Sequence, residues 1–204
     1  MHTYQPTLTF KGGRTYVHGT TIYEQIILGA TSLGLGNVDG KLRINLRGQL
    51  HHQAEFIYAD PSEKSSKPDT AVTDFDLTVS GKPMTGWVQA SVPPVDTNKT
   101  YNENLIRQHA AIDGQTITFN GQTDFQPIEV STSMAVQLHQ ALYPPQGNQK
   151  WLLARVTLEQ PFAPSKTQSM QLELKRIIGN KFTETNIITQ GKKCGQFHFL
   201  LGDV

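Results

Sequence analysis

Two short stretches of the chain, one in each half, carry the residues best suited to chemistry. The first places His18 directly before Gly19 and an apolar segment. An imidazole can donate or accept a proton near neutral pH, and a glycine lets a ligand approach the backbone closely. The second stretch places Asp124 and Glu129 ahead of another apolar segment. A carboxylate opposite an imidazole would complete an acid–base pair.

Each of these side chains also has a purely structural interpretation. His18 would be an ordinary histidine in the turn before a helix, since the sequence shows no partner for it. Glu129 and Asp124 would be stabilised by the positive end of a helix dipole. Ser131 and Thr132 are predicted as N-caps, because a nucleophilic hydroxyl needs a nearby base and none can be named. The sequence alone leaves both interpretations open.

The sequence predicts neither a metal site nor a cofactor. His51 and His52 are neighbours on an expected strand, so their side chains point to opposite faces and cannot easily hold one ion. The remaining histidines show no ligand spacing. Cys194 follows two lysines and is predicted to be a turn cysteine rather than a nucleophile.

Composition narrows the function class. Charged residues make up 17% of the 204 residues and the net charge is +1, with no basic stripe, which argues against a nucleic-acid partner. No run approaches the roughly 20 apolar residues that span a bilayer, and the N-terminus has no charged-then-apolar leader. A single cysteine excludes a disulfide framework and indicates a reducing compartment. We therefore predict a cytoplasmic protein.

Two apolar segments predict one helix in each half. Thr20–Leu33 opens with a capping-box pattern formed by Thr21 and Glu24, and glycines stop it. Ser131–Tyr143 ends before Pro144-Pro145, which cannot continue a helix.

Alternating apolar and polar residues predict strands in both halves. The expected strands are Thr7–Phe10, Lys41–Ala59 with a bend at Gly48, Ala71–Ser80, Met84–Val92, Gln115–Phe119, Trp151–Glu159, Ser169–Ile178, Lys181–Gln190 and Gly195–Leu201. Turns are expected at Ser80-Gly81, Gly179-Asn180 and Gly191-Lys192, and a short helix at Leu105–Ile112.

The two halves match each other in register, which indicates an internal duplication. Thr7–Phe10 aligns with Thr116–Phe119, and Thr73-Asp74 aligns with Thr183-Glu184 at a nearly constant offset. We predict two units, residues 1–94 and 115–204, joined by a linker over 95–114. The simplest fold class is α+β, with two tandem units, each a long antiparallel sheet around one helix, forming one continuous sheet.

This architecture resembles a double hotdog, the fold of hotdog dehydratases. Trp151–Gly202 is similar to their C-terminal part, with an arginine-bearing strand, the turn Pro161-Phe162-Ala163-Pro164 and the pattern G-x-F-x-F that begins at Gly195. The N-terminal half resembles the dehydratase domains of polyketide synthases more closely. Those domains carry H-x-x-x-G-x-x-x-x-P, then a glycine and a helix with an early Glu.

The catalytic motifs of that family are degenerate in this chain. Thr9 stands at the position of the family's His, and His18 stands at the position of its Pro. Gly13 and Gly19 fit the pattern, as does Glu24 in the helix. In the second half Pro127 fits, but the family's acid position reads Ser131.

The resemblance implies a protein that acts on or binds an acyl thioester carried by acyl carrier protein or coenzyme A, in fatty-acid or polyketide-type metabolism. As a dehydratase or thioesterase it would use His18 with Glu129 or Asp124 as the acid–base pair. Gly19, with Gly13 and Ser131, would then bind the substrate. The alternatives are a non-catalytic acyl-binding or scaffolding subunit and an unrelated β-rich interaction protein. A homodimer is a further open alternative.

Overall fold

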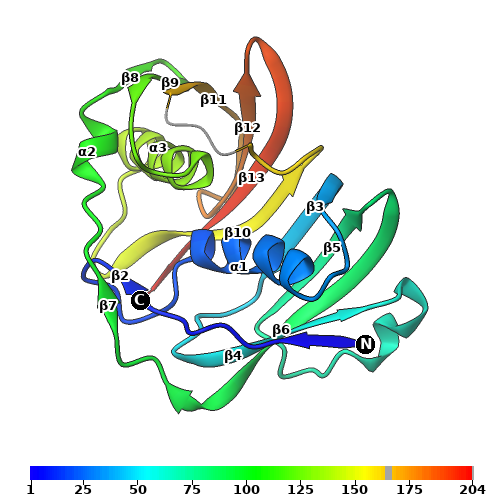
Figure 1. Ribbon diagram of the computed structural model, residues 1–204. Coiled ribbons are helices and arrows are strands. Elements are labelled where there is room, and N and C mark those ends of the chain that lie inside the picture. The colour runs from blue at the N-terminus through cyan, green and yellow to red at the C-terminus, as the bar shows by residue number, and fades with distance from the viewer. Residues whose placement is uncertain (164–166, 204) are drawn as a thin grey trace. The chain divides into compact units, whose positions relative to one another are not determined.

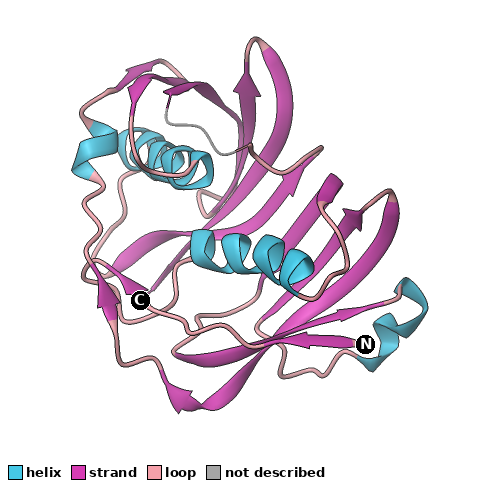
Figure 2. Cartoon of the chain, viewed as in Figure 1, coloured by secondary structure: helices cyan, strands magenta, loops and turns pink. Residues whose placement is uncertain are grey.

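The computed structural model describes residues 1–163 and 167–203 of the chain, so Pro164 of the expected Pro161–Pro164 turn lies outside the described residues. The chain divides into two compact units, Met1–Tyr101 with Glu159–Pro161, and Asn102–Leu158 with Phe162–Val204. Each unit places one long helix against an antiparallel sheet (Figure 1, Figure 2). No helix in the described part of the chain is long and apolar enough to cross a membrane.

In the first unit, α1 (Gly19–Ser32) packs on the strands β3 and β4. The sheet has the order β1 (His2–Tyr4), β4 (His52–Ala59), β6 (Lys82–Pro94), β5 (Thr73–Val79) and β3 (Val38–Leu46). A separate parallel ribbon joins β2 (Phe10–Lys11) and β7 (Asn98–Lys99). Because a strand alternates its side chains between two faces, Leu42 and Ile44 are buried while Arg43 is exposed.

Two tyrosines hold α1 on its sheet. The Tyr58 hydroxyl donates to the carbonyl oxygen of Ile26 at 2.6 Å, and the Tyr4 hydroxyl donates to Gln25 Oε1 at 3.0 Å. Gly29 of α1 makes this approach possible, since a Cβ there would overlap the Tyr58 hydroxyl and the Tyr4 ring. Burial raises the pKa of Tyr58, so its hydroxyl stays protonated and donates.

The face of the first sheet opposite α1 carries a small core of its own. Ile57 and Ala59 on β4 point away from the helix, because Tyr58 points toward it. They cluster with Trp87 of β6 and with Ala71. Ala71 belongs to the connection from β4 to β5, which contains the 3-10 turn η1 (Pro61–Ser66). The η1 turn of this connection contacts β6, and Ala71 packs with the buried Trp87.

In the second unit, α3 (Pro127–Leu142) packs on β9, β10 and β11, and on the short helix α2 (Asn104–Arg107). The sheet has the order β10 (Gln149–Leu158), β13 (Lys192–Asp203), β12 (Phe182–Thr189), β11 (Thr167–Ile178), β9 (Thr116–Gln122) and β8 (Ala110–Asp113). Phe119, Phe197 and Phe199 are fully buried. The α+β class and the two tandem units, each a helix with an antiparallel sheet, are thus confirmed, and this arrangement is the double hotdog.

The predicted residue register between the halves is wrong in two places. Thr7–Phe10 was expected to match β9, but β1 takes the sheet position, and the side chain of Gln53 pairs with both backbone groups of Leu8 instead. Thr73 and Thr183 do not match in space either. Thr73 lies on β5, which is the neighbour of β3, the first strand after α1. Thr183 lies on β12, but the neighbour of β10, the first strand after α3, is β13.

Two of the predicted hairpin turns are confirmed by residues with a positive φ. Ser80 and Gly81 have φ of 49° and 74°, and Gly179 and Asn180 have φ of 56° and 54°, as a two-residue hairpin turn requires. The third hairpin turn lies one residue earlier than predicted. Gln190 and Gly191 form it, with φ of 51° and 71°.

Three local predictions are wrong. Leu105–Ile112 is not one helix, because α2 ends at Arg107 and β8 follows. Ser131 and Thr132 are not N-caps, because α3 begins at Pro127 with Gln126 as its N-cap. Thr21 and Glu24 form no capping box, because the N-cap of α1 is His18 and the Glu24 carboxylate pairs with Lys11.

Candidate functional site

The N-terminal end of α1 is shaped by the turn before it. Gly12, with φ of +63°, turns the chain sharply after β2, and β2 is itself held by β7. This turn brings Lys11 against the first turns of α1. His18 then adopts an extended backbone, with φ of −66° and ψ of 142°, and serves as N-cap without a side-chain cap bond. No acidic residue stands in the first turn of α1.

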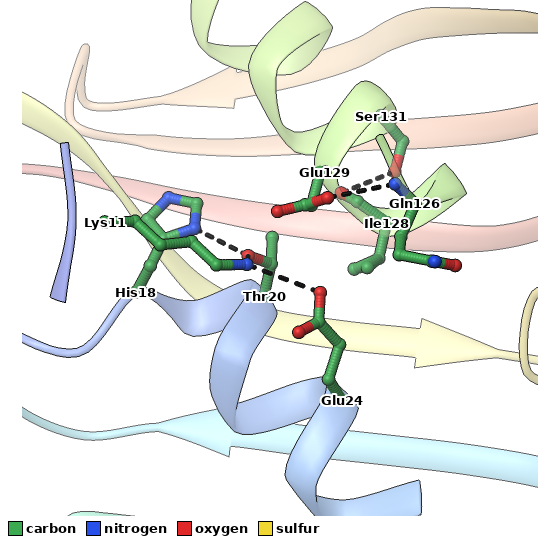
Figure 3. A network of polar contacts seen from close by, with 8 residues as sticks. All are labelled: Lys11, His18, Thr20, Glu24, Gln126, Ile128, Glu129 and Ser131. Carbon is green, nitrogen blue, oxygen red and sulfur yellow. Dashed lines mark hydrogen bonds and ion pairs between the residues drawn. The ribbon is translucent and has the colours of Figure 1, made fainter. Parts of the chain in front are cut away.

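Lys11 is a buried cation, only 5% exposed. Its ammonium donates to Thr20 Oγ1 at 3.1 Å and lies 3.4 Å from Glu24 Oε1 (Figure 3). Thr20 and Glu24 reach the same ammonium because residues four apart share a face of a helix. The Tyr101 ring adds a cation–π contact, with its centroid 5.6 Å from Lys11 Nζ.

His18 completes this cluster. Its Nδ1 lies 2.7 Å from Thr20 Oγ1, and its ring is 6.0 Å from the Tyr101 ring. Burial holds the pKa of His18 well below its usual range, and the nearby charges of Arg14 and Lys11 lower it further. The imidazole is therefore neutral at physiological pH. The Arg14 guanidinium lies over the same Tyr101 ring, 5.5 Å from its centroid.

The two glycines predicted to bind substrate, Gly13 and Gly19, flank the residues between the Gly12 turn and α1. Gly19 is the first residue of α1. Gly13 is exposed, and a Cβ added there would meet nothing within 4 Å. Their assignment to substrate binding stays a prediction.

In the second unit the predicted residues lie around the start of α3. The backbone N–H of Gln126 donates to Glu129 Oε2 at 2.9 Å (Figure 3). The two residues form a capping box, and Glu129 is only 8% exposed. Ser131 is fully buried, and its hydroxyl donates to the Ile128 carbonyl at 3.1 Å. Asp124 is exposed in the preceding loop. The carboxylate of Glu129 thus has a structural role, and the pairing of His18 with Glu129 or Asp124 stays a prediction.

Sequence reasoning missed Lys11 and Thr20, which the structure brings together with His18 and Glu24. A signal was present, because a lysine beside the Gly12-Gly13 turn and a threonine four residues before a glutamate are both visible in the sequence. What the sequence does not show is that the turn folds Lys11 back onto the helix. Within the described residues no group of three His, Cys, Asp or Glu is placed to hold a metal ion.

A further imidazole, that of His139, lies inside the second unit. It is fully buried, its Nε2 lies 2.9 Å from Thr185 Oγ1, and its ring packs on Phe199 and Trp151 at 4.9 and 5.1 Å. Burial lowers the pKa of His139 to about 3. It is a core residue.

No protein-family model matches the chain, and no curated protein matches its sequence. Among solved structures, it is similar to an assigned oleoyl thioesterase from Lactobacillus plantarum, with 12% identity, a TM-score of 0.49, and coverage of 100% of this chain and 95% of that one. The tesB protein of Mycobacterium avium subs paratuberculosis gives 9% identity, a TM-score of 0.49, and coverage of 92% and 88%.

A bifunctional dehydratase-cyclase domain from ambruticin biosynthesis gives 11% identity, a TM-score of 0.46, and coverage of 94% and 83%. These similarities concern the fold. One long helix packed on an antiparallel sheet in each of two tandem units identifies the fold as a double hotdog.

Proposed function

We propose that the chain binds an acyl thioester, with the thioester carbonyl at the N-terminal end of α1. One observation carries the proposal: this helix begins with no side-chain cap and no acidic residue in its first turn, beside a neutral imidazole, the Arg14 guanidinium and the Lys11 ammonium, which is paired with Glu24. The free amides of a first helical turn and a positive surrounding favour an oxygen that carries partial negative charge. A thioester carbonyl is such an oxygen.

The carrier in this proposal is coenzyme A or acyl carrier protein, and the compartment is the cytoplasm. Two chemical outcomes differ in what the chain must supply. Dehydration or hydrolysis of the thioester needs a group that takes a proton, with His18 and either Glu129 or Asp124 as the proposed pair. Binding without turnover needs none. The capping box favours binding, because it already uses one oxygen of the Glu129 carboxylate.

Titration with butyryl-coenzyme A tests the binding site. We expect saturable binding in calorimetry, weakened at least tenfold by His18→Ala and left unchanged by His52→Ala, which removes an exposed imidazole of the same unit. Thermal unfolding of both variants checks that they fold. Absence of saturable binding to the wild-type protein, or equal binding by both variants, would overturn the proposal.

Turnover separates the two chemical outcomes. The protein is incubated with 3-hydroxybutyryl-coenzyme A, and the enoyl product and any released thiol are measured. Enoyl thioester or free thiol that His18→Ala abolishes would establish catalysis. Binding without either product would establish the acyl-binding subunit.

A further inference from the structure

Thr20 decides which nitrogen of His18 carries the proton. Its hydroxyl has one hydrogen to donate and two lone pairs that accept. Lys11 Nζ, an ammonium that can only donate, lies 3.1 Å from Thr20 Oγ1, and His18 Nδ1 lies 2.7 Å from it. Thr20 is fully buried. Its hydrogen bonds therefore have to be assigned among these neighbours.

Only one arrangement satisfies all three groups. If Lys11 donates to Thr20 Oγ1 and the hydroxyl hydrogen donates to His18 Nδ1, every polar hydrogen between them has an acceptor. If Nδ1 carried the proton instead, Thr20 Oγ1 would accept twice, and its own hydrogen would be buried with no acceptor among these neighbours. A buried donor left without an acceptor is costly, so the first arrangement is favoured.

The positive charge on Lys11 stabilises this arrangement of hydrogen bonds. Its ammonium is paired with Glu24 and lies over the Tyr101 ring, so it stays in place as a cation. A cation that donates to a hydroxyl oxygen polarises the hydroxyl and makes it a better donor in turn. The two hydrogen bonds are therefore both donated in the same direction, from Lys11 to Thr20 and from Thr20 to His18.

We propose that Lys11 and Thr20 are positioning residues that hold His18 as the neutral tautomer with its proton on Nε2, so that His18 presents a hydrogen-bond donor to an acceptor oxygen of the ligand. Figure 3 shows the second ring nitrogen on the side of the imidazole away from Thr20. The identity of that oxygen as a thioester carbonyl rests on the proposed function. The tautomer itself does not.

This assignment changes the chemical role of His18. The lone pair of Nδ1 is taken up by Thr20, and Nε2 carries a hydrogen, so neither nitrogen is placed to accept a proton from the ligand. The imidazole instead polarises the carbonyl and stabilises negative charge that develops on its oxygen. No bond is broken and no proton is transferred in this step.

The tautomer is measured directly by nitrogen–proton correlation spectra of protein labelled at histidine nitrogen, because bare and protonated ring nitrogens resonate far apart. His18→Gln identifies the His18 signals. We expect a bare Nδ1 and a protonated Nε2 in the wild type and in Thr20→Ser, which keeps the hydroxyl. In Thr20→Val, which has the same shape without it, the Nδ1-protonated form should be populated.

A protonated Nδ1 in the wild type overturns the inference, whatever the variants do. So does an unchanged tautomer in a folded Thr20→Val protein, with folding judged from the unperturbed signals of the other histidines. Lys11→Met supplies the next step, and we expect it to increase exchange between the two tautomers.

A matched pair of ligands tests the acceptor. Butyryl-coenzyme A carries the thioester carbonyl, and S-butyl-coenzyme A lacks only that oxygen. We expect the His18 Nε2 proton to move downfield on saturation with the thioester and not with the thioether. The same shift with both ligands, or with neither, overturns the donor role. If butyryl-coenzyme A does not bind at all, the proposed function fails while the measured tautomer still decides the positioning of His18.

Discussion

Gly29 shows how one missing side chain sets the position of a helix. It lies on α1 where the rings of Tyr4 and Tyr58 reach the helix backbone, and a Cβ would overlap both. We predict that Gly29→Ala lowers the free energy of unfolding by about 1–3 kcal/mol, the usual cost of overpacking a core, despite the higher helix propensity of alanine.

Urea unfolding measures this effect. Gly48→Ala is the matched control, because a Cβ at Gly48 meets nothing within 4 Å. It should change stability by no more than about 0.5 kcal/mol. A cost for Gly29→Ala no larger than that of the control would contradict the packing argument.

His139 makes the stability of the second unit depend on pH. Its pKa is about 3 in the folded chain and about 6.5 when unfolded, so between these values the unfolded state binds more protons. The contribution is fully present above about pH 6.5 and decreases as the pH falls toward 3. At pH 5 the expected loss is about 2 kcal/mol relative to neutral pH.

The comparison is between the wild type and His139→Gln, each unfolded with urea at pH 7.5 and pH 5. His18 and the carboxylates titrate in both proteins, so their shares cancel in the difference. We expect the wild type to lose about 2 kcal/mol more than the variant over this interval. An equal loss in both would show that the imidazole of His139 is protonated, or reaches water, in the folded protein.

At the scale of elements, the two helix starts have different chemistry. The start of α3 is closed by its own side chains, Gln126 and Glu129, whereas His18 at the start of α1 makes no side-chain cap bond. We predict that Glu129→Ala destabilises the protein by about 0.5–2 kcal/mol, as loss of a cap does, and that Glu129→Gln costs less because the amide oxygen still accepts from Gln126.

Thermal unfolding of both variants gives the stability, and the thioester assays give the function. If Glu129→Gln keeps stability and loses turnover, the Glu129 carboxylate takes part in catalysis as well as capping the helix. If it keeps both, Glu129 is a cap alone.

The sequence predicted the elements better than their partners. Hairpin turns such as Gly179-Asn180 were predictable because positive φ selects glycine and asparagine. The position of β1 was not, because Thr7–Phe10 is the better strand by local pattern and only the tertiary pairing with β4 favours His2–Tyr4.

The candidate site divides in the same way. His18 was predictable from its residue type and place in the chain. Its neighbours Lys11 and Thr20 were not, because a contact between a turn residue and a helix depends on the path of the backbone between them.

At the scale of the whole molecule, the net charge of +1 bears on association with the proposed ligands. Coenzyme A and acyl carrier protein are both acidic, but a nearly neutral protein gives them little long-range attraction. We therefore predict that the association rate of butyryl-coenzyme A falls by less than about threefold between low and physiological ionic strength. Stopped-flow fluorescence measures it, and a steep decrease with salt would point to a concentrated positive patch.

The different strand orders of the two units have a consequence for the time course of folding. In the second unit, β11, β12 and β13 pair consecutively through two short turns. In the first unit, β4 pairs with β6 and not with β5, its successor along the chain. Its place in the sheet exists only once the β5–β6 hairpin has formed, and contacts distant in sequence form slowly.

The chain has two tryptophans, Trp87 in the first unit and Trp151 in the second, and each reports on its own unit. We expect Trp87 to acquire its native fluorescence later than Trp151 in stopped-flow refolding, followed in the variants Trp151→Phe and Trp87→Phe respectively. Simultaneous recovery would mean that the docking of β4 does not delay the folding of the first unit. If Trp87 does lag, the nascent first unit exposes an unpaired β4 for longest, and this is the strand through which aggregation would begin.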